Sequence, residues 1–150
     1  MGVLVDNLQK KVEVDKERLK ALAERVLVEE NADPAYEVSV ALIDKETMRA
    51  LNSRYRGINA PTDVLSFSMR EGKSFFVSPV SILGDVLICP EVAAQNARKF
   101  GHSFDEELSL LVVHGVLHLL GYRDESEEER KVISDRQKEL LIRLRKTDQD

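Results

Sequence analysis

The chain has almost no cysteine and no long apolar run, and these two absences limit the kinds of protein that it can be. Cys89 is the only cysteine among 150 residues, so no intramolecular disulfide can form and nothing indicates an oxidising compartment. No uninterrupted apolar stretch approaches the roughly 20 residues that span a bilayer. The first residues, Met-Gly-Val-Leu-Val-Asp, contain neither a basic leader nor a cleavage-like site. We therefore expect a cytoplasmic protein without a membrane partner, in which Cys89 is a small buried apolar residue.

An overall excess of basic residues is also missing. The formal net charge is −5, whereas proteins that bind nucleic-acid backbone nonspecifically are usually basic over the whole domain. No DNA partner is expected. Residues 49–73 are the exception, because they hold five basic side chains against two acidic ones. This segment can contact a few phosphates, although a solvated surface explains its charge equally well.

Two histidines lie one helical turn apart in the segment His114-Gly-Val-Leu-His118-Leu-Leu-Gly121-Tyr-Arg-Asp124. On a helix this spacing places both imidazoles on one face, within reach of a single ion. Gly121 can adopt the left-handed conformation that ends a helix, after which the chain can bring Asp124 toward the rings. Two neutral imidazoles and one carboxylate leave a coordination position open for water, which is typical of a catalytic rather than a structural zinc site.

The same residues also have a purely structural interpretation. A histidine pair can arise by chance, and an aspartate after a helix is a common cap or turn former. The run 108–120 is apolar except for Ser109 and the two histidines, so the helix should be largely buried. Because burying two imidazoles without partners is costly, we predict a metal site formed by His114, His118 and Asp124.

The pattern of apolar and turn-forming residues predicts one domain over residues 1–150, with no linker or internal repeat. Strands are expected at Val3–Val14, Tyr36–Ile43, Val64–Met69 and Ile82–Ile88. Helices are expected after the caps Asp15, Asp44, Ser103 and Ser126, and at Pro90–Phe100. Strands and helices interleave without a strict βαβ rhythm. This predicts an α+β single-domain sandwich, in which a roughly four-stranded mixed sheet packs against about five helices around a central metal-binding helix.

Four ordered sequence blocks together resemble a known family. The blocks are Leu51-Asn52-Ser-Arg-Tyr55-Arg56, Pro61-Thr-Asp-Val-Leu-Ser-Phe67, Leu83-Gly-Asp85-Val-Leu-Ile88 and His114-Gly-x-x-His118-x-x-Gly121-Tyr122. They cover nearly the whole chain and resemble the YbeY endoribonucleases of bacterial ribosomal RNA maturation. The resemblance implies a single-strand-specific, metal-dependent endoribonuclease. Its implied substrate is the 3′ end of 16S ribosomal RNA on the small ribosomal subunit, with a further role in ribosome quality control.

One position departs from the family pattern, which continues Gly-Tyr-Asp-His with that histidine as the third zinc ligand. This chain reads Gly121-Tyr122-Arg123-Asp124. A carboxylate oxygen binds zinc at about the same distance as an imidazole nitrogen, so Asp124 can replace the histidine. The added negative ligand should make bound water less acidic and favour harder ions. We expect one Zn²⁺ per chain, with Mn²⁺ or Mg²⁺ as alternatives.

Arg56 is the predicted catalytic residue, because the resemblance marks this arginine as functionally important. A planar guanidinium can hold two phosphate oxygens, and a structural salt bridge is the alternative role. Asp63 is expected to cap or fix a turn, Asp85 to orient a ligand or end a turn, and His102 to be structural. The general base, the cleavage position and the oligomeric state stay open.

Two other functions fit parts of the sequence. The spacing His-x-x-x-His-x-x-Gly-x-x-Asp resembles the extended zinc motif of metallopeptidases. Those enzymes carry a glutamate base after the first histidine, whereas this chain has Gly115, which cannot transfer a proton. The second alternative is an RNA-binding ribosome-assembly factor whose metal only holds the fold together. The open coordination position argues against a purely structural ion.

Overall fold

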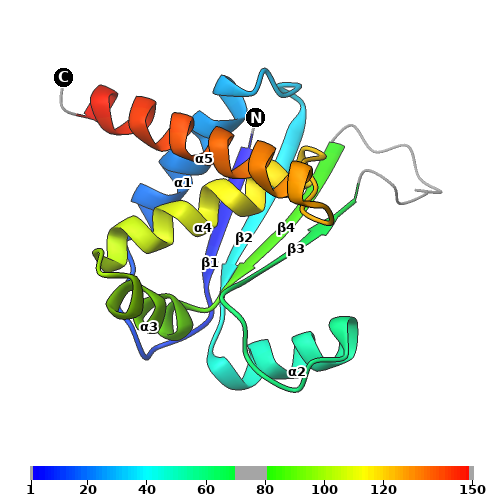
Figure 1. The fold of residues 1–150 in the computed structure, drawn as a ribbon, viewed down its shortest axis with the longest axis vertical. Helices are drawn as coiled ribbons and strands as arrows, with labels where there is room; N and C mark the ends of the chain where they lie inside the picture. Colours follow the sequence, from blue (N-terminus) through cyan, green and yellow to red (C-terminus); the bar gives the residue numbers. More distant parts are fainter. Residues whose placement is uncertain (1, 70–80, 149–150) are drawn as a thin grey trace.

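Strands and helices alternate along the chain in the computed structural model, which describes residues 2–69 and 81–148 (Figure 1). Within these ranges the elements are β1 (Gly2–Asn7), α1 (Lys16–Glu29), β2 (Tyr36–Leu42), α2 (Lys45–Arg56), β3 (Val64–Ser68), β4 (Ser81–Ile88), α3 (Pro90–Phe100), α4 (Phe104–Leu119) and α5 (Glu127–Asp148). The polar segment between the third and fourth strands lies outside the described residues. No helix in the described ranges is long and apolar enough to cross a membrane.

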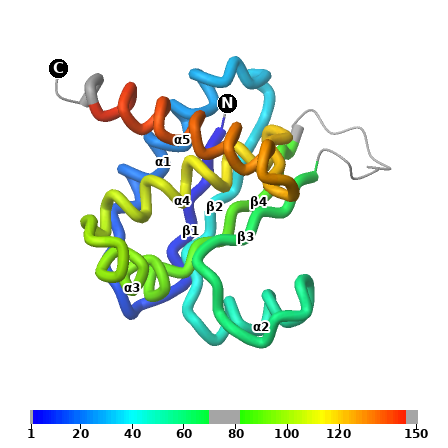
Figure 2. The backbone as a smooth tube through the Cα atoms, in the orientation of Figure 1, coloured from blue at the N-terminus to red at the C-terminus, as the bar shows by residue number. Residues whose placement is uncertain are grey.

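The four strands form one mixed sheet with the order β1-β2-β4-β3. β1 pairs with β2 and β2 with β4 in parallel, while β3 and β4 are antiparallel. Helices cover the sheet, and α2 and α5 lie on opposite sides of the molecule (Figure 2). The predicted α+β class, with a four-stranded mixed sheet and five helices, is confirmed.

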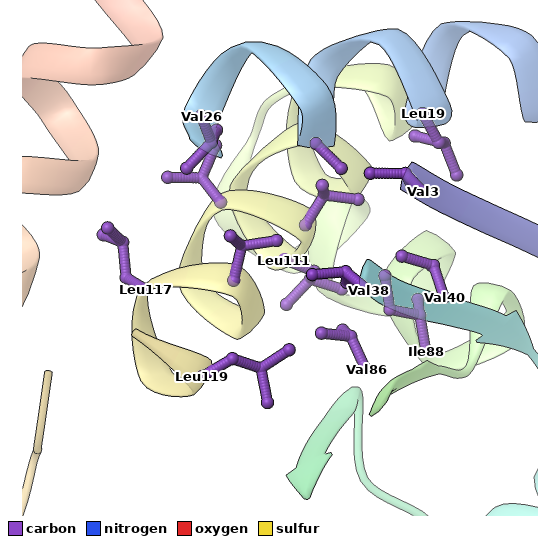
Figure 3. Close-up of a cluster of buried hydrophobic side chains, with 14 of the residues drawn as sticks. Val3, Leu19, Val26, Val38, Val40, Val86, Ile88, Leu111, Leu117 and Leu119 are labelled. Atoms are coloured by element: carbon purple, nitrogen blue, oxygen red, sulfur yellow. The ribbon is translucent and has the colours of Figure 1, made fainter. Parts of the chain in front are cut away.

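Helix α4 is the centre of the main core, as the sequence predicts. It contacts α1, α3, α5, β3 and β4. Alternate residues of the parallel strands point toward it, among them Val38, Val40, Val86 and Ile88, which are all buried (Figure 3). Because α4 is surrounded by apolar side chains on most of its circumference, its direction relative to the sheet is well determined.

A second, smaller cluster lies on the other face of the sheet. Successive strand residues point to opposite faces, so Leu65 of β3 packs away from α4 and against Met48 of α2. Cys89 belongs to the same cluster and is fully buried, which confirms its predicted role. This contact holds α2 near the edge strand β3.

The predicted helix starts are confirmed by hydrogen bonds. The side chains of Asp15, Asp44 and Ser103 each accept a bond from the backbone N–H three residues later. Ser126 and Glu129 form a complete capping box, in which each side chain accepts from the other's backbone N–H at 3.1 Å. These caps satisfy N–H groups that have no partner inside the helix.

The expected first strand, Val3–Val14, is too long, because β1 ends at Asn7. The buried side chain of Gln9 explains the early end. Its Oε1 accepts from the N–H groups of Lys11 and Val12, and its Nε2 donates to the Val12 carbonyl at 2.8 Å. A side chain that bonds its own neighbouring backbone stabilises a turn in competition with a strand.

Candidate metal centre

The end of α4 carries the candidate site. His114 and His118 lie on one side of this helix and are half-buried. After Leu119 the backbone turns back: the N–H of Gly121 donates to the His118 carbonyl, and that of Tyr122 to the Leu117 carbonyl. Gly121 has a φ of 108°, a value that favours glycine. The turn predicted to bring Asp124 toward the histidines is therefore present.

The three predicted ligands converge. His114 Nε2 and His118 Nε2 are 2.9 Å apart, and His118 Nε2 is 3.3 Å from Asp124 Oδ2. One ligand atom from each of the three residues lies within 4.8 Å of the other two. Ligands at about 2.0–2.1 Å from a tetrahedral zinc ion are about 3.3 Å from one another. The donor set and spacing therefore fit a single ion, and Asp124 is the exposed member of the set.

Gln137 of α5 contacts the ring nitrogen of His114 that faces away from the candidate site, and the sequence did not predict this contact. Its Oε1 accepts a hydrogen bond from His114 Nδ1. An amide oxygen can only accept, so Nδ1 carries the proton and Nε2 keeps the lone pair needed to bind a metal. Gln137 stands in the buried stripe of α5 with Ile133, Leu140 and Leu144. The sequence signal that could have identified Gln137 is a polar residue within an apolar helix face.

Burial also keeps His114 neutral. Removal of the ring from water lowers the pKa of His114 below its usual 6.5, although the hydrogen bond to Gln137 acts in the opposite direction. The neutral imidazole is the form that binds a metal. The buried environment therefore maintains the ligand form of His114 to a lower pH than in water.

Polar contacts also hold the segment that carries Asp124. The Tyr122 hydroxyl donates to Glu30 Oε2 at 2.9 Å, and Arg136 Nε lies 2.5 Å from the other oxygen of Glu30. Arg130 donates to the Asp124 carbonyl at 3.2 Å. The loop is thus attached to the end of α1 and to α5, which limits the freedom of Asp124, the third candidate ligand.

Arg56, the predicted catalytic residue, lines the same cleft as the histidines and Asp124. It is exposed at the last position of α2. The buried Asn52, one turn earlier, donates to the Ala60 carbonyl at 2.8 Å and fixes the loop after the helix. Arg56 and the three candidate ligands therefore share one cleft. Hydroxyls of three further residues, Thr62, Ser66 and Ser68, also line this cleft.

Gly115 packs directly against the sheet. A Cβ atom there would lie 2.5 Å from Val86 Cγ1 and 3.3 Å from Ser66 Oγ. Both distances are too short for the contact to be accepted without movement. A glutamate at this position, as in the metallopeptidase motif, would be forced into the sheet. The packing of α4 on the sheet therefore explains sterically why this fold has no room for a glutamate base at position 115.

Of the other acidic and histidine candidates, Asp63 and His102 have structural partners. Asp63 lines the cleft, but its carboxylate accepts from the Val64 N–H and from Asn96 Nδ2, as expected of a residue that fixes a turn. Asp85 lies inside β4, opposite Phe67, so it does not end a turn. His102 Nε2 is 2.5 Å from the buried Glu107, which agrees with a structural role.

Comparison with known proteins places the chain in a family. The family model described as Endoribonuclease YbeY matches residues 4–145. A protein of that name from Pelotomaculum thermopropionicum is 47% identical, over 98% of this chain and 99% of its own. One from Thermobifida fusca is 44% identical, over 91% and 90%. The solution structure of TM1509 from Thermotoga maritima has a TM-score of 0.61 and 29% identity, over 97% of this chain and 93% of its own. The predicted resemblance is confirmed, and this chain belongs to the YbeY family of endoribonucleases.

Proposed function

We propose that this protein is a single-strand-specific, metal-dependent endoribonuclease that matures the 3′ end of 16S ribosomal RNA and acts in ribosome quality control. Its partner is the small ribosomal subunit and its location is the cytoplasm. The observation that carries the proposal is the meeting of His114, His118, Asp124 and Arg56 in one cleft. Membership of the endoribonuclease YbeY family supports the reaction class.

In the proposed site, His114, His118 and Asp124 hold one Zn²⁺, with Mn²⁺ or Mg²⁺ as alternatives. Such an ion acts as a Lewis acid, which stabilises the negative charge that develops on a phosphodiester during hydrolysis. The protein contributes the His114 imidazole in its neutral form, because burial lowers the pKa of His114. The carboxylate of Asp124 reduces the net positive charge of the site and favours harder ions more than a third histidine would.

Arg56 is proposed to bind the scissile phosphate. Its planar guanidinium can donate two parallel hydrogen bonds to phosphate oxygens, which both orients the phosphodiester and balances its charge. The fixed loop after α2 supports this role, since Asn52 and Ala60 hold the backbone next to the arginine. A held backbone reduces the number of positions that the guanidinium must lose on binding a phosphate.

The reaction is tested with purified protein and a 16S RNA fragment that carries an unprocessed, single-stranded 3′ end. We expect cleavage that a chelator abolishes and Zn²⁺ or Mn²⁺ restores, and no cleavage of the same segment in a duplex. Arg56→Ala should bind metal normally and cleave roughly 10²–10³-fold more slowly, while Ser53→Ala, on the same helix, should have no effect. Cleavage at the original rate by Arg56→Ala would refute the proposed role of Arg56 in binding the scissile phosphate.

The same preparation separates the rival functions. Casein hydrolysis that disappears in His118→Ala would favour a metallopeptidase. RNA binding without turnover, together with a metal that changes only the melting temperature, would favour an assembly factor with a structural ion.

A further inference from the structure

An exposed aromatic ring stands at the end of α2, beside the cleft. Tyr55 is 56% exposed, yet its ring is held on two sides. The centroid of the Tyr55 ring lies 5.1 Å from the centroid of the Phe67 ring in an edge-to-face arrangement. The Arg54 guanidinium carbon lies 5.5 Å from the Tyr55 centroid. Both contacts are favourable geometries for aromatic rings. The ring is therefore fixed in orientation while more than half of the residue stays open to solvent.

The position of this ring relative to the cleft follows from chain alternation. Arg56 follows Tyr55, and Ser66 and Ser68 flank Phe67; all three of these neighbours line the cleft. Successive residues of a strand point to opposite faces, so Phe67 lies on the reverse side of β3, and Tyr55 lies there too because its ring contacts Phe67. Within the described residues β3 is an edge strand of the sheet. A flexible polymer that crosses this edge can reach both the ring and the cleft.

The charge around the ring suits a polyanion. Between residues 45 and 69 four basic side chains stand against two acidic ones, although the whole chain has a net charge of −5. Arg54 and Arg56 are both exposed, on either side of Tyr55. Exposed aromatic rings interleaved with arginines are how many proteins bind single-stranded nucleic acid, because the rings stack on bases while the cations contact phosphates.

We propose that Tyr55, backed by Phe67 and Arg54, is a stacking subsite for one unpaired nucleobase of the RNA substrate, next to the phosphate held by Arg56. The proposal rests on the proposed endoribonuclease function and adds to it a base-binding position. The subsite tolerates any base, since stacking uses the π face rather than the hydrogen-bonding edge. It also favours single strands, because a base inside a duplex cannot open onto the ring.

The test measures equilibrium binding of the full chain to a labelled single-stranded RNA, by fluorescence anisotropy in a chelator that prevents cleavage. Tyr55→Leu should bind roughly 5- to 150-fold more weakly, and Tyr55→Phe, which keeps the ring, within about twofold of the original protein. Phe100→Leu is the matched control. Phe100 is 60% exposed and also has a cation, Lys99, over its ring at 5.6 Å, but it does not line this cleft. We expect Phe100→Leu to bind the RNA as tightly as the original protein.

A scan of single abasic positions in the RNA identifies the stacked base. At one position near the cleavage site the abasic RNA should bind the original protein and Tyr55→Leu equally well, because the partner of the ring is missing in both cases. Equal affinities of Tyr55→Leu and the original protein for intact RNA would overturn the subsite. The subsite would also be overturned if Tyr55→Leu bound intact RNA more weakly and no abasic position removed the difference in affinity between the two proteins.

The outcomes also separate this proposal from the proposed function. If the original protein binds and cleaves RNA while Tyr55→Leu is unaffected, only the stacking subsite fails. If the original protein neither binds nor cleaves RNA, both proposals fail. Circular dichroism of each variant checks that the fold is intact, and Tyr55→Phe provides the comparison even where the leucine variant is unstable.

Discussion

At the scale of single residues, Gln137 of α5 contacts His114 of α4, the helix that carries both candidate histidine ligands. Its amide oxygen fixes the tautomer of His114, and such outer partners typically contribute 10- to 100-fold to metal affinity. Gln137→Leu should therefore bind Zn²⁺ about 10- to 100-fold more weakly in a competition titration with a coloured chelator. Gln137→Glu keeps an acceptor and should retain most of the affinity. Equal affinity of Gln137→Leu and the original protein would contradict the assignment.

The residues of the site differ in how far the sequence could predict them. His114, His118 and Asp124 could be brought together by local geometry alone, because a helical turn and a glycine stop relate them. Arg56 could not, since it comes from another element, and only the resemblance to a family singled it out. Gln137 was missed because its contact with His114 spans 23 positions, and a polar residue in a helix stripe does not reveal its partner.

At the scale of elements, the close approach of α4 to β4 depends on Gly115. A Cβ atom at this position would meet Val86 Cγ1 at 2.5 Å, and overpacking of this kind typically costs about 1–3 kcal/mol. Gly115→Ala should lower the free energy of unfolding by this amount in urea denaturation. The cost includes displacement of the helix that carries both histidines.

A double-mutant cycle isolates this contact. Val86→Ala removes the two methyl groups that a Cβ at position 115 would meet, and alone it should destabilise the protein by leaving a cavity. In combination with Gly115→Ala its cost should shrink, because the added methyl fills that space. Strict additivity of the two free-energy changes would show that the glycine is required for another reason.

Element boundaries were predictable wherever a local rule determines them. The helix starts at Asp15, Asp44 and Ser103 follow from side chains that bond the next backbone turn. The end of β1 did not follow, because β-branched residues recur beyond Asn7, at Val12 and Val14. There the side chain of Gln9 replaces strand pairing by a turn, a competition that apolar patterning does not register.

At the scale of the whole molecule, a bound ion would add a link between α4 and the loop that leads into α5. The histidines belong to α4, and Asp124 lies in the loop that leads into α5. An ion that binds only the folded state at 100 times its dissociation constant adds about 2.7 kcal/mol of stability. For a domain of this size we expect the melting temperature to rise by roughly 5–10 °C.

Calorimetry with and without Zn²⁺ measures this shift, and two variants define its origin. His118→Ala should melt at the same temperature with and without the ion. Arg56→Ala should keep the full shift, since the arginine is not a ligand. A shift that persists in His118→Ala would mean that the ion binds elsewhere.

Strand β4 lies between β2 and β3 in the sheet although it follows both in the chain. During synthesis the earlier segments emerge first, so Arg56 leaves the ribosome well before β4 can complete the sheet and before α4 has a surface to pack on. The support for His114 arrives later still, with α5. A nascent chain therefore contains its cationic segment before the residues of the candidate metal site can come together. The strand order thus makes completion of the sheet, and of the surface against which α4 packs, depend on a strand that is synthesised after both of its neighbours.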